Sequence, residues 1–168
     1  MRTIETNIYT ISDHPNTTLC FDWIRANWHD LNQSSVDEMI DSLKALRDAV
    51  GGELDCSISQ APDRGEFVKL TDFDPEALSA LDLSARRVKL DAAGRAEGCP
   101  LTGHWTDYSV IQALRSGNLA SILDEIHSET EAVYSDEGLR ELCEANGYEF
   151  TEGGTFYPGS PLAALPTP

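Results

Sequence analysis

The stretch Ser35-Val-Asp-Glu-Met-Ile-Asp-Ser-Leu-Lys-Ala-Leu-Arg-Asp-Ala-Val-Gly-Gly52 has the most regular hydrophobic pattern in this chain of 168 residues. Its apolar residues recur at steps of three and four, the period of a helix with one buried face. They are Val36, Met39, Ile40, Leu43, Leu46 and Val50. Ser35 and Glu38 have the spacing of a capping box, and the glycine pair is typical of a helix end. The pattern therefore predicts an amphipathic helix from Ser35 to Gly51.

A β-hairpin is predicted directly after this helix. Apolar and polar residues alternate over 53–60, Ala61-Pro-Asp-Arg-Gly65 is typical of a turn, and a second apolar stretch covers 66–71. Asp74 before Pro75 then has the order of a helix N-cap followed by a first-turn proline. We expect a short helix from there to Leu81.

The other elements are predicted from the same signals. A strand is expected over 3–11, helices over 15–31, 107–116, 119–134 and 136–146, and short strands over 148–152 and 155–157. The mixture without βαβ alternation predicts an α+β fold, in which the hairpin and the N- and C-terminal strands form a small antiparallel sheet packed with about five helices. We expect a single domain over 1–157 with an acidic helical half from about 106, and an irregular Pro-rich tail over 158–168.

Composition excludes several classes of function. There are 29 acidic and 12 basic residues, a net charge of −17 and a pI near 4.3, which opposes direct binding to nucleic acid or an anionic membrane. No apolar run reaches the length of about 18 residues that a membrane-spanning helix needs. The first ten residues lack the apolar core of a signal peptide, so a cytoplasmic location is expected.

The acidic excess is concentrated near the C-terminal end. Residues 121–152 contain ten acids, and Arg140 is their only base. In the helix over 119–134 the predicted buried stripe is Leu119, Leu123, Ile126 and Val133; in the next helix it is Leu139, Leu142 and Cys143. The carboxylates predicted to point away from these stripes, and to bind a partner, are Asp124, Glu125, Glu129, Glu131, Glu137, Glu141 and Glu144.

Two interpretations of these carboxylates remain open. Acidic helices commonly serve as solvated faces that promote solubility. A row of carboxylates along a helix can also imitate the charge density of a phosphate backbone, and solubility alone would not require the near absence of bases after Arg115.

Catalytic signals are weak. Cys99, His104 and Asp107 lie within nine residues, but a nucleophilic thiol is recognised by geometry rather than by sequence proximity. The alternative is a loop packed by Trp105. We therefore expect no enzyme activity.

No cofactor site is predicted either. The histidines at 14, 29, 104 and 127 have no HxxxH or HExxH spacing, the four cysteines form no CxxC pair, and no glycine-rich phosphate loop is present. Trp23 and Trp28 are interpreted as core residues of the first helix.

Four segments carry a resemblance to known proteins: Ile8-Tyr-Thr-Ile11, Cys99-Pro-Leu-Thr-Gly-His-Trp-Thr-Asp107, Ser135-Asp-Glu-Gly138 and Ala145-Asn-Gly-Tyr-Glu-Phe-Thr-Glu152. They resemble segments of small acidic proteins of tailed phages and prophages. That group is mostly without assigned function, and small acidic phage proteins include anti-CRISPR and anti-restriction inhibitors. The resemblance implies a phage or mobile-element origin and the cytoplasm of an infected bacterium.

These observations lead to three hypotheses. The first is a non-enzymatic inhibitor whose acidic helices occupy a basic nucleic-acid channel of a host defence protein, such as a CRISPR effector complex. The second is a module that binds its target sterically, through the hairpin or through a face with Arg86, Arg87 and Lys89, and uses its charge for solubility. The third is a small enzyme built on Cys99, His104 and Asp107.

Overall fold

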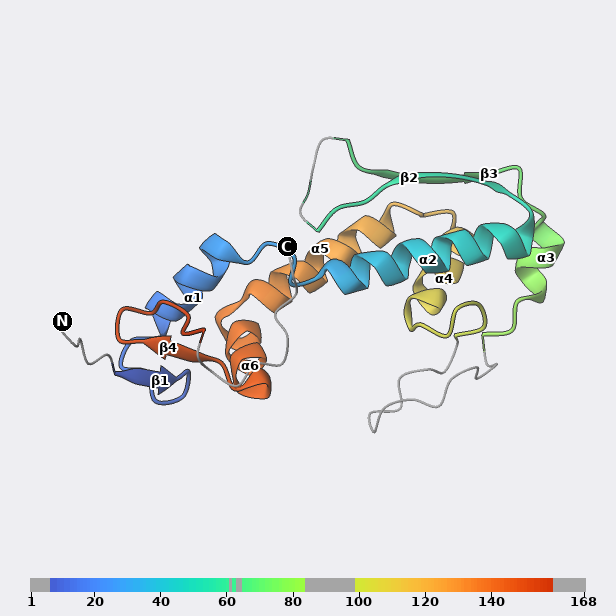
Figure 1. Ribbon diagram of the computed structural model, residues 1–168. Coiled ribbons are helices and arrows are strands. Elements are labelled where there is room, and N and C mark those ends of the chain that lie inside the picture. The colour runs from blue at the N-terminus through green and yellow to red at the C-terminus, as the bar shows by residue number, and fades with distance from the viewer. Residues whose placement is uncertain (1–6, 61, 63–64, 84–98, 159–168) are drawn as a thin grey trace. The chain divides into compact units, whose positions relative to one another are not determined.

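The computed structural model describes residues 7–60, 62, 65–83 and 99–158 (Figure 1). They form six helices and four short strands, which confirms the α+β class. The strands form two separate antiparallel pairs, whereas the sequence predicted a single sheet. The chain divides into two compact units: unit 1 combines Met1–Leu31 with Thr130–Pro168, and unit 2 is Asn32–Glu129. Each unit is described by itself below.

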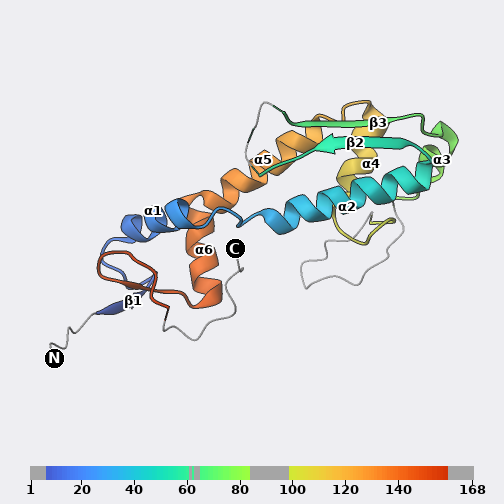
Figure 2. The same ribbon diagram turned by 45° about the horizontal axis from the view of Figure 1, so that its top comes forward.

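Unit 2 is built around a long helix and a hairpin. The helix is α2 (Gln33–Val50), and the hairpin pairs β2 (Glu53–Ser57) with β3 (Phe67–Thr71). In both ribbon views the hairpin lies along α2 (Figures 1 and 2). The unit also contains α3 (Pro75–Ala80), α4 (Thr106–Ser116) and most of α5 (Ser121–Tyr134).

The hydrophobic core of unit 2 confirms the predicted stripe of α2. Five of its six residues are buried and Ile40 is partly buried against them. The hairpin adds Leu70 from one strand, and α4 and α5 add Val110, Ile111, Ile122 and Ile126. Burial of apolar surface of this kind, at about 25 cal/mol per Å², is the main term that holds such a unit together.

Two helix starts in unit 2 differ from the prediction. α2 begins at Gln33, so Ser35 lies inside the helix rather than capping it. α4 begins at Thr106, whose hydroxyl bonds Ser42 Oγ at 2.7 Å instead of capping its own helix. The cap signal at Ser35 is wrong because the helix begins two residues earlier. The cap signal at Thr106 is wrong because its hydroxyl bonds a residue of another helix.

Unit 1 joins the two ends of the chain. Strand β1 (Ile8–Thr10) pairs with β4 (Glu149–Thr151), and helix α1 (Thr17–Asn27) packs against α6 (Asp136–Asn146). Phe156 forms an isolated bridge with Phe150, which corresponds to the predicted last strand. Nine core residues are buried here: Ile11, Cys20, Phe21, Ile24, Leu139, Cys143, Tyr148, Phe150 and Phe156.

Several predictions fall on residues outside the description. They are the beginning of the first strand, the face with Arg86, Arg87 and Lys89, and the tail beyond Pro158. Within the described ranges, no helix combines the length and the apolar character needed to cross a bilayer.

Candidate partner-binding surface

The structure separates the seven predicted carboxylates into two groups. Five are exposed: Asp124, Glu131, Glu137, Glu141 and Glu144. Glu125 and Glu129 are half-buried in unit 2, which corrects the prediction that they point away from the core. The reason is the position of the buried stripe of α5, which runs through Ile122 and Ile126. Residues 125 and 129 lie three positions after these isoleucines and therefore on the flank of the same face.

The two half-buried carboxylates contact other helices of unit 2. Ser109 of α4 donates a hydrogen bond of 2.7 Å to Glu125 Oε1. Glu129 Oε2 is buried without a hydrogen-bond partner. Burial, together with the nearby carboxylates Glu125 and Glu38, raises the pKa of Glu129, although a bond to Ser35 opposes this. These two residues are thus unsuited to a surface that docks on a partner.

The best-defined part of the acidic surface is α6, whose ends are those predicted from the sequence. Ser135 Oγ accepts a 3.0 Å hydrogen bond from the backbone N–H of Gly138, and Gly147 closes the helix in the left-handed conformation. Leu139 and Cys143 are fully buried. The opposite side of the helix presents Glu137, Glu141 and Glu144, which we call the α6 carboxylate row.

The two arginines in the described part of unit 1 do not neutralise this row. The guanidinium of Arg140 lies 5.7 Å from the ring centroid of Phe21, and that of Arg25 lies 6.0 Å from the same ring. Arg25 also donates to Tyr134 O at 3.0 Å and pairs with Asp136. These are the only Lys or Arg residues among the described part of unit 1. The guanidinium groups of Arg25 and Arg140 therefore both lie beside Phe21.

Glu137 and Glu141 form no hydrogen bond or ion pair within the described residues, while Glu144 accepts a 2.9 Å bond from Ser12 Oγ. Helix geometry places the three carboxylates at steps of about 6 and about 4.5 Å along the axis. Among the residues that the structure describes, no basic side chain compensates this strip of negative charge.

The proposed catalytic trio is arranged differently from an active site. Asp107 is fully buried, and its Oδ2 accepts backbone N–H groups of residues 101–103 at 2.8–3.1 Å. Its Oδ1 accepts hydroxyl groups of Ser42 and Thr102, each at 2.7 Å. The carboxylate therefore shapes the loop before α4 and joins it to α2.

The remaining two members of the trio are not activated by Asp107. His104 Nδ1 lies 3.6 Å from Glu38 Oε2 rather than bonding the aspartate. Cys99 is buried, and burial followed by the charge of Asp107 raises the pKa of its thiol. A raised thiol pKa lowers the thiolate fraction, so the nucleophile that the enzyme hypothesis needs is disfavoured.

Histidines and carboxylates of the described residues do not gather into a group of three that could hold a metal ion. Two histidines have structural partners instead. His127 Nε2 lies 3.1 Å from Glu66 Oε2, and His14 bonds Thr151 O and the backbone N–H of Asn16.

One further surface escaped the sequence analysis. Trp23 and Trp28 are half-buried at the edge of the unit 1 core, not inside it, and Tyr157 is 38% exposed. The spacing of the tryptophans could not reveal this, because residues at the edge and in the middle of a core lie on the same helix stripe.

Comparisons with protein-family models, curated proteins and solved structures found no match.

Proposed function

We propose that this protein is a non-enzymatic inhibitor that presents the α6 carboxylate row to a basic, nucleic-acid-binding surface of another protein. The observation that carries the proposal is the uncompensated row itself, on a helix whose only base lies over Phe21. A net charge of −17 extends the same field over the whole chain. Carboxylates at this spacing take the place of phosphates opposite Lys and Arg, speed the encounter at low salt and compete with nucleic acid.

The partner class follows from the resemblance to small acidic phage proteins. We place the protein in the cytoplasm of an infected bacterium, where its target is a DNA- or RNA-binding defence complex such as a CRISPR effector. Such a complex needs a positively charged channel for its nucleic acid, which is the complement of the α6 carboxylate row.

The test uses purified CRISPR effector complexes and DNA-binding assays at a series of NaCl concentrations. We expect the triple variant E137Q/E141Q/E144Q to need about tenfold more protein for the same inhibition, with a flatter salt dependence. The matched control is D37N/D41N/D48N, which removes the same charge from exposed positions of α2. Inhibition by the α6 triple variant at the wild-type concentration would reject this mechanism.

The steric alternative is supported by one observation in unit 2. Phe67 of β3 is 41% exposed, and Lys69 is exposed on the same strand. If this hairpin is the docking face, Phe67→Ser weakens inhibition while the α6 triple variant leaves it unchanged. The same inhibition assay therefore separates the two mechanisms.

A further inference from the structure

Five aromatic rings of unit 1 form one connected cluster. Trp23 stacks on Phe156 with a centroid separation of 6.0 Å and an interplanar angle of 23°. Trp28 meets Trp23, Phe156 and Tyr148 edge-on at 5.8, 5.6 and 5.3 Å. Phe150 joins through Phe156 at 6.0 Å. Rings held in this way lose little conformational freedom when a partner binds.

The cluster has a buried base and a partly open rim. Tyr148, Phe150 and Phe156 are buried, whereas Trp23 and Trp28 are half-buried. Tyr157, next along the chain from Phe156, is exposed. Its N–H bonds Glu149 O beside the Phe150–Phe156 bridge, so its side chain points to the other side of the strand from Phe156. We call Trp23 and Trp28 the aromatic surface.

The backbone under the aromatic surface is fixed at two points. Tyr134 Oη donates a 2.9 Å hydrogen bond to Trp28 O, which holds the end of α1. Gly154, at φ +78°, lies so close to α1 that an added Cβ would be 2.5 Å from Leu19 Cβ. The loop that leads to Phe156 is therefore held against the helix that carries Trp23.

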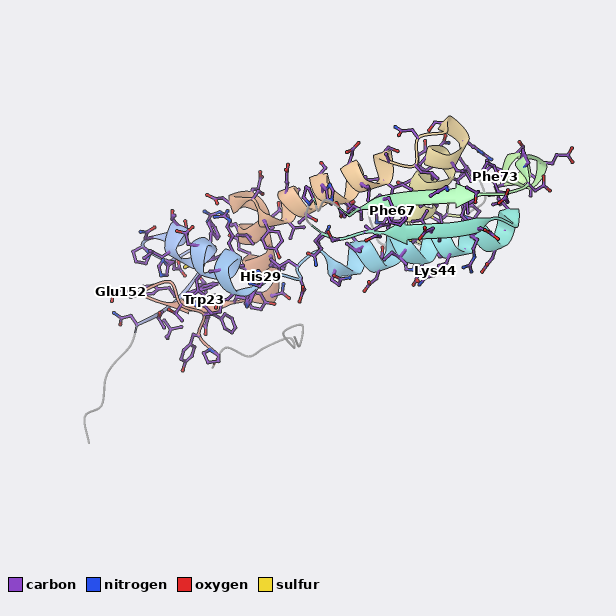
Figure 3. All side chains as sticks on the ribbon, turned by 90° about the horizontal axis from the view of Figure 1, so that it is seen from above. Trp23, His29, Lys44, Phe67, Phe73 and Glu152 are labelled. Carbon is purple, nitrogen blue, oxygen red and sulfur yellow. The ribbon has the colours of Figure 1, made fainter. Side chains whose placement is uncertain are left out.

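Exposed carboxylates lie close in the chain to the aromatic surface and to Phe156 beneath it. Asp22, which also lies 3.7 Å from Arg25, precedes Trp23, Asp30 follows Trp28 by two residues, and Glu152 lies in the loop before Phe156. Figure 3 labels Trp23, on α1, and Glu152, on that loop. Aromatic faces and carboxylates together attract cations, and a guanidinium stacks on an indole while its N–H groups reach carboxylates. Unit 1 already uses this chemistry, since two guanidinium groups lie over the Phe21 ring.

We propose that the aromatic surface binds arginine side chains of the basic partner and is the anchor of the complex. This inference rests on the proposed function and adds to it, because the α6 carboxylate row supplies attraction at a distance but no packed contact. Arginine is preferred over lysine because its flat, weakly hydrated guanidinium can stack on a ring, whereas an ammonium acts as a point charge.

The probes are synthetic octa-arginine and octa-lysine peptides of equal charge, with binding measured by calorimetry and by NMR of the indole N–H groups. We expect octa-arginine to bind about three- to tenfold more tightly than octa-lysine. Trp23→Phe and Trp28→Phe should bring that ratio close to one, because Phe is a weaker cation binder than Trp. Near-ultraviolet circular dichroism establishes that each variant is folded.

The matched controls lie in unit 2. Trp105→Phe replaces a tryptophan that is half-buried like Trp23 and Trp28, and Tyr108→Ser removes an exposed ring, and both should leave the arginine preference unchanged. Equal dissociation constants for the two wild-type complexes, or a preference that survives both aromatic-surface variants, would overturn the inference.

The same titrations separate this inference from the proposed function. E137Q/E141Q/E144Q should weaken both peptides and flatten their salt dependence while the arginine-to-lysine ratio persists. If that variant weakens neither peptide but the aromatic variants abolish the ratio, the α6 mechanism fails and the arginine-binding surface stands. If the ratio is absent while the α6 variant still weakens salt-dependent binding, only the aromatic inference fails.

Discussion

Helices α2 and α6 bury their apolar stripes in the same way but treat their outward charges differently. On α2, Asp41 pairs with Lys44 at 3.2 Å, Arg47 pairs with Asp48, and Asp37 accepts a 2.9 Å bond from Gln33. On α6, Asp136 pairs with Arg25, but the one arginine of the helix lies over Phe21 and the α6 carboxylate row lacks a basic partner within the described residues. The first pattern is that of a solvated face on which Asp41 and Asp48 each have a basic partner. The second leaves net charge that only a partner or salt can balance.

The comparison depends on both helices having a buried apolar stripe. Substitutions in these stripes should have the largest effects on the free energy of unfolding. Leu43 of α2 and Leu139 of α6 are both fully buried. Truncation to alanine at either position should lower the free energy of unfolding by about 2–5 kcal/mol, because the cavity is only partly refilled. Denaturant titration measures the loss, with Lys44→Ala as an exposed control expected to cost less than about 0.5 kcal/mol. A similar cost for all three variants would contradict the buried stripes.

The start of α6 is packed closely against the end of α5. A Cβ on Gly138 would lie 2.3 Å from the carbonyl oxygen of Ala132 and 2.8 Å from that of Val133. Backbone oxygens cannot rotate away, so Gly138→Ala should cost about 3 kcal/mol through displacement of the helix start. Gly65→Ala is the control, since an added Cβ meets nothing within 4 Å there. Equal thermal stability of the two variants would show that the start of α6 moves to accommodate the added Cβ at little cost in free energy.

A carboxylate inside unit 2 sharpens the contrast with the exposed row. Because the pKa of Glu129 is raised in the folded protein, its contribution to stability is fully present below the ordinary glutamate pKa and is lost as pH rises through the raised value. Glu129→Gln should remove this pH dependence and raise the free energy of unfolding at pH 7 by about 1 kcal/mol. Urea titrations between about pH 4 and about pH 8, a range that begins near the ordinary glutamate pKa, measure the free energy of unfolding and its pH dependence. Unchanged pH dependence in the variant would assign it to another group.

The smallest expected effect has opposite signs on the two helices. Glu141→Gln removes repulsion from Glu137 and Glu144 and should stabilise the protein by about 0.2–0.5 kcal/mol at low salt. Asp41→Asn removes the pair with Lys44 and should destabilise it by a similar amount. Both shifts should shrink at about 1 M salt, where the charges are screened. Shifts of the same sign would mean that the two outer faces do not differ in charge balance.

Local signals in the sequence predicted a large part of the fold. The stripe of α2, its end at Gly51, the hairpin and the Asp74 cap of α3 all appear in the structure. So do Ser135 and Gly147 as the ends of α6. Each of these stripes, caps and turns depends on residues within a few positions of one another. The local sequence is therefore enough to predict it.

The errors concern residues whose partners are distant in the sequence. Glu125 and Glu129 were predicted to be outward because Leu123 was placed on the buried stripe of α5 in place of Ile122, and their contacts with α4 and α2 depend on distant residues. Asp107 was considered a catalytic candidate, but its carboxylate bonds Ser42, 65 positions away. The pairing of β1 with β4, which separates the strands into two sheets, is of the same kind.

The sequence by itself determined which segments form helices, where α6 begins and ends, which side of α6 is apolar and how much negative charge the chain carries, because periodicity and composition are local or additive properties. Only the tertiary structure decided which carboxylates stay uncompensated, since that depends on Arg140 lying over Phe21, more than a hundred positions away. It also decided that Trp23 and Trp28 reach the edge of their core, because burial is a property of how whole elements pack and not of any one helix.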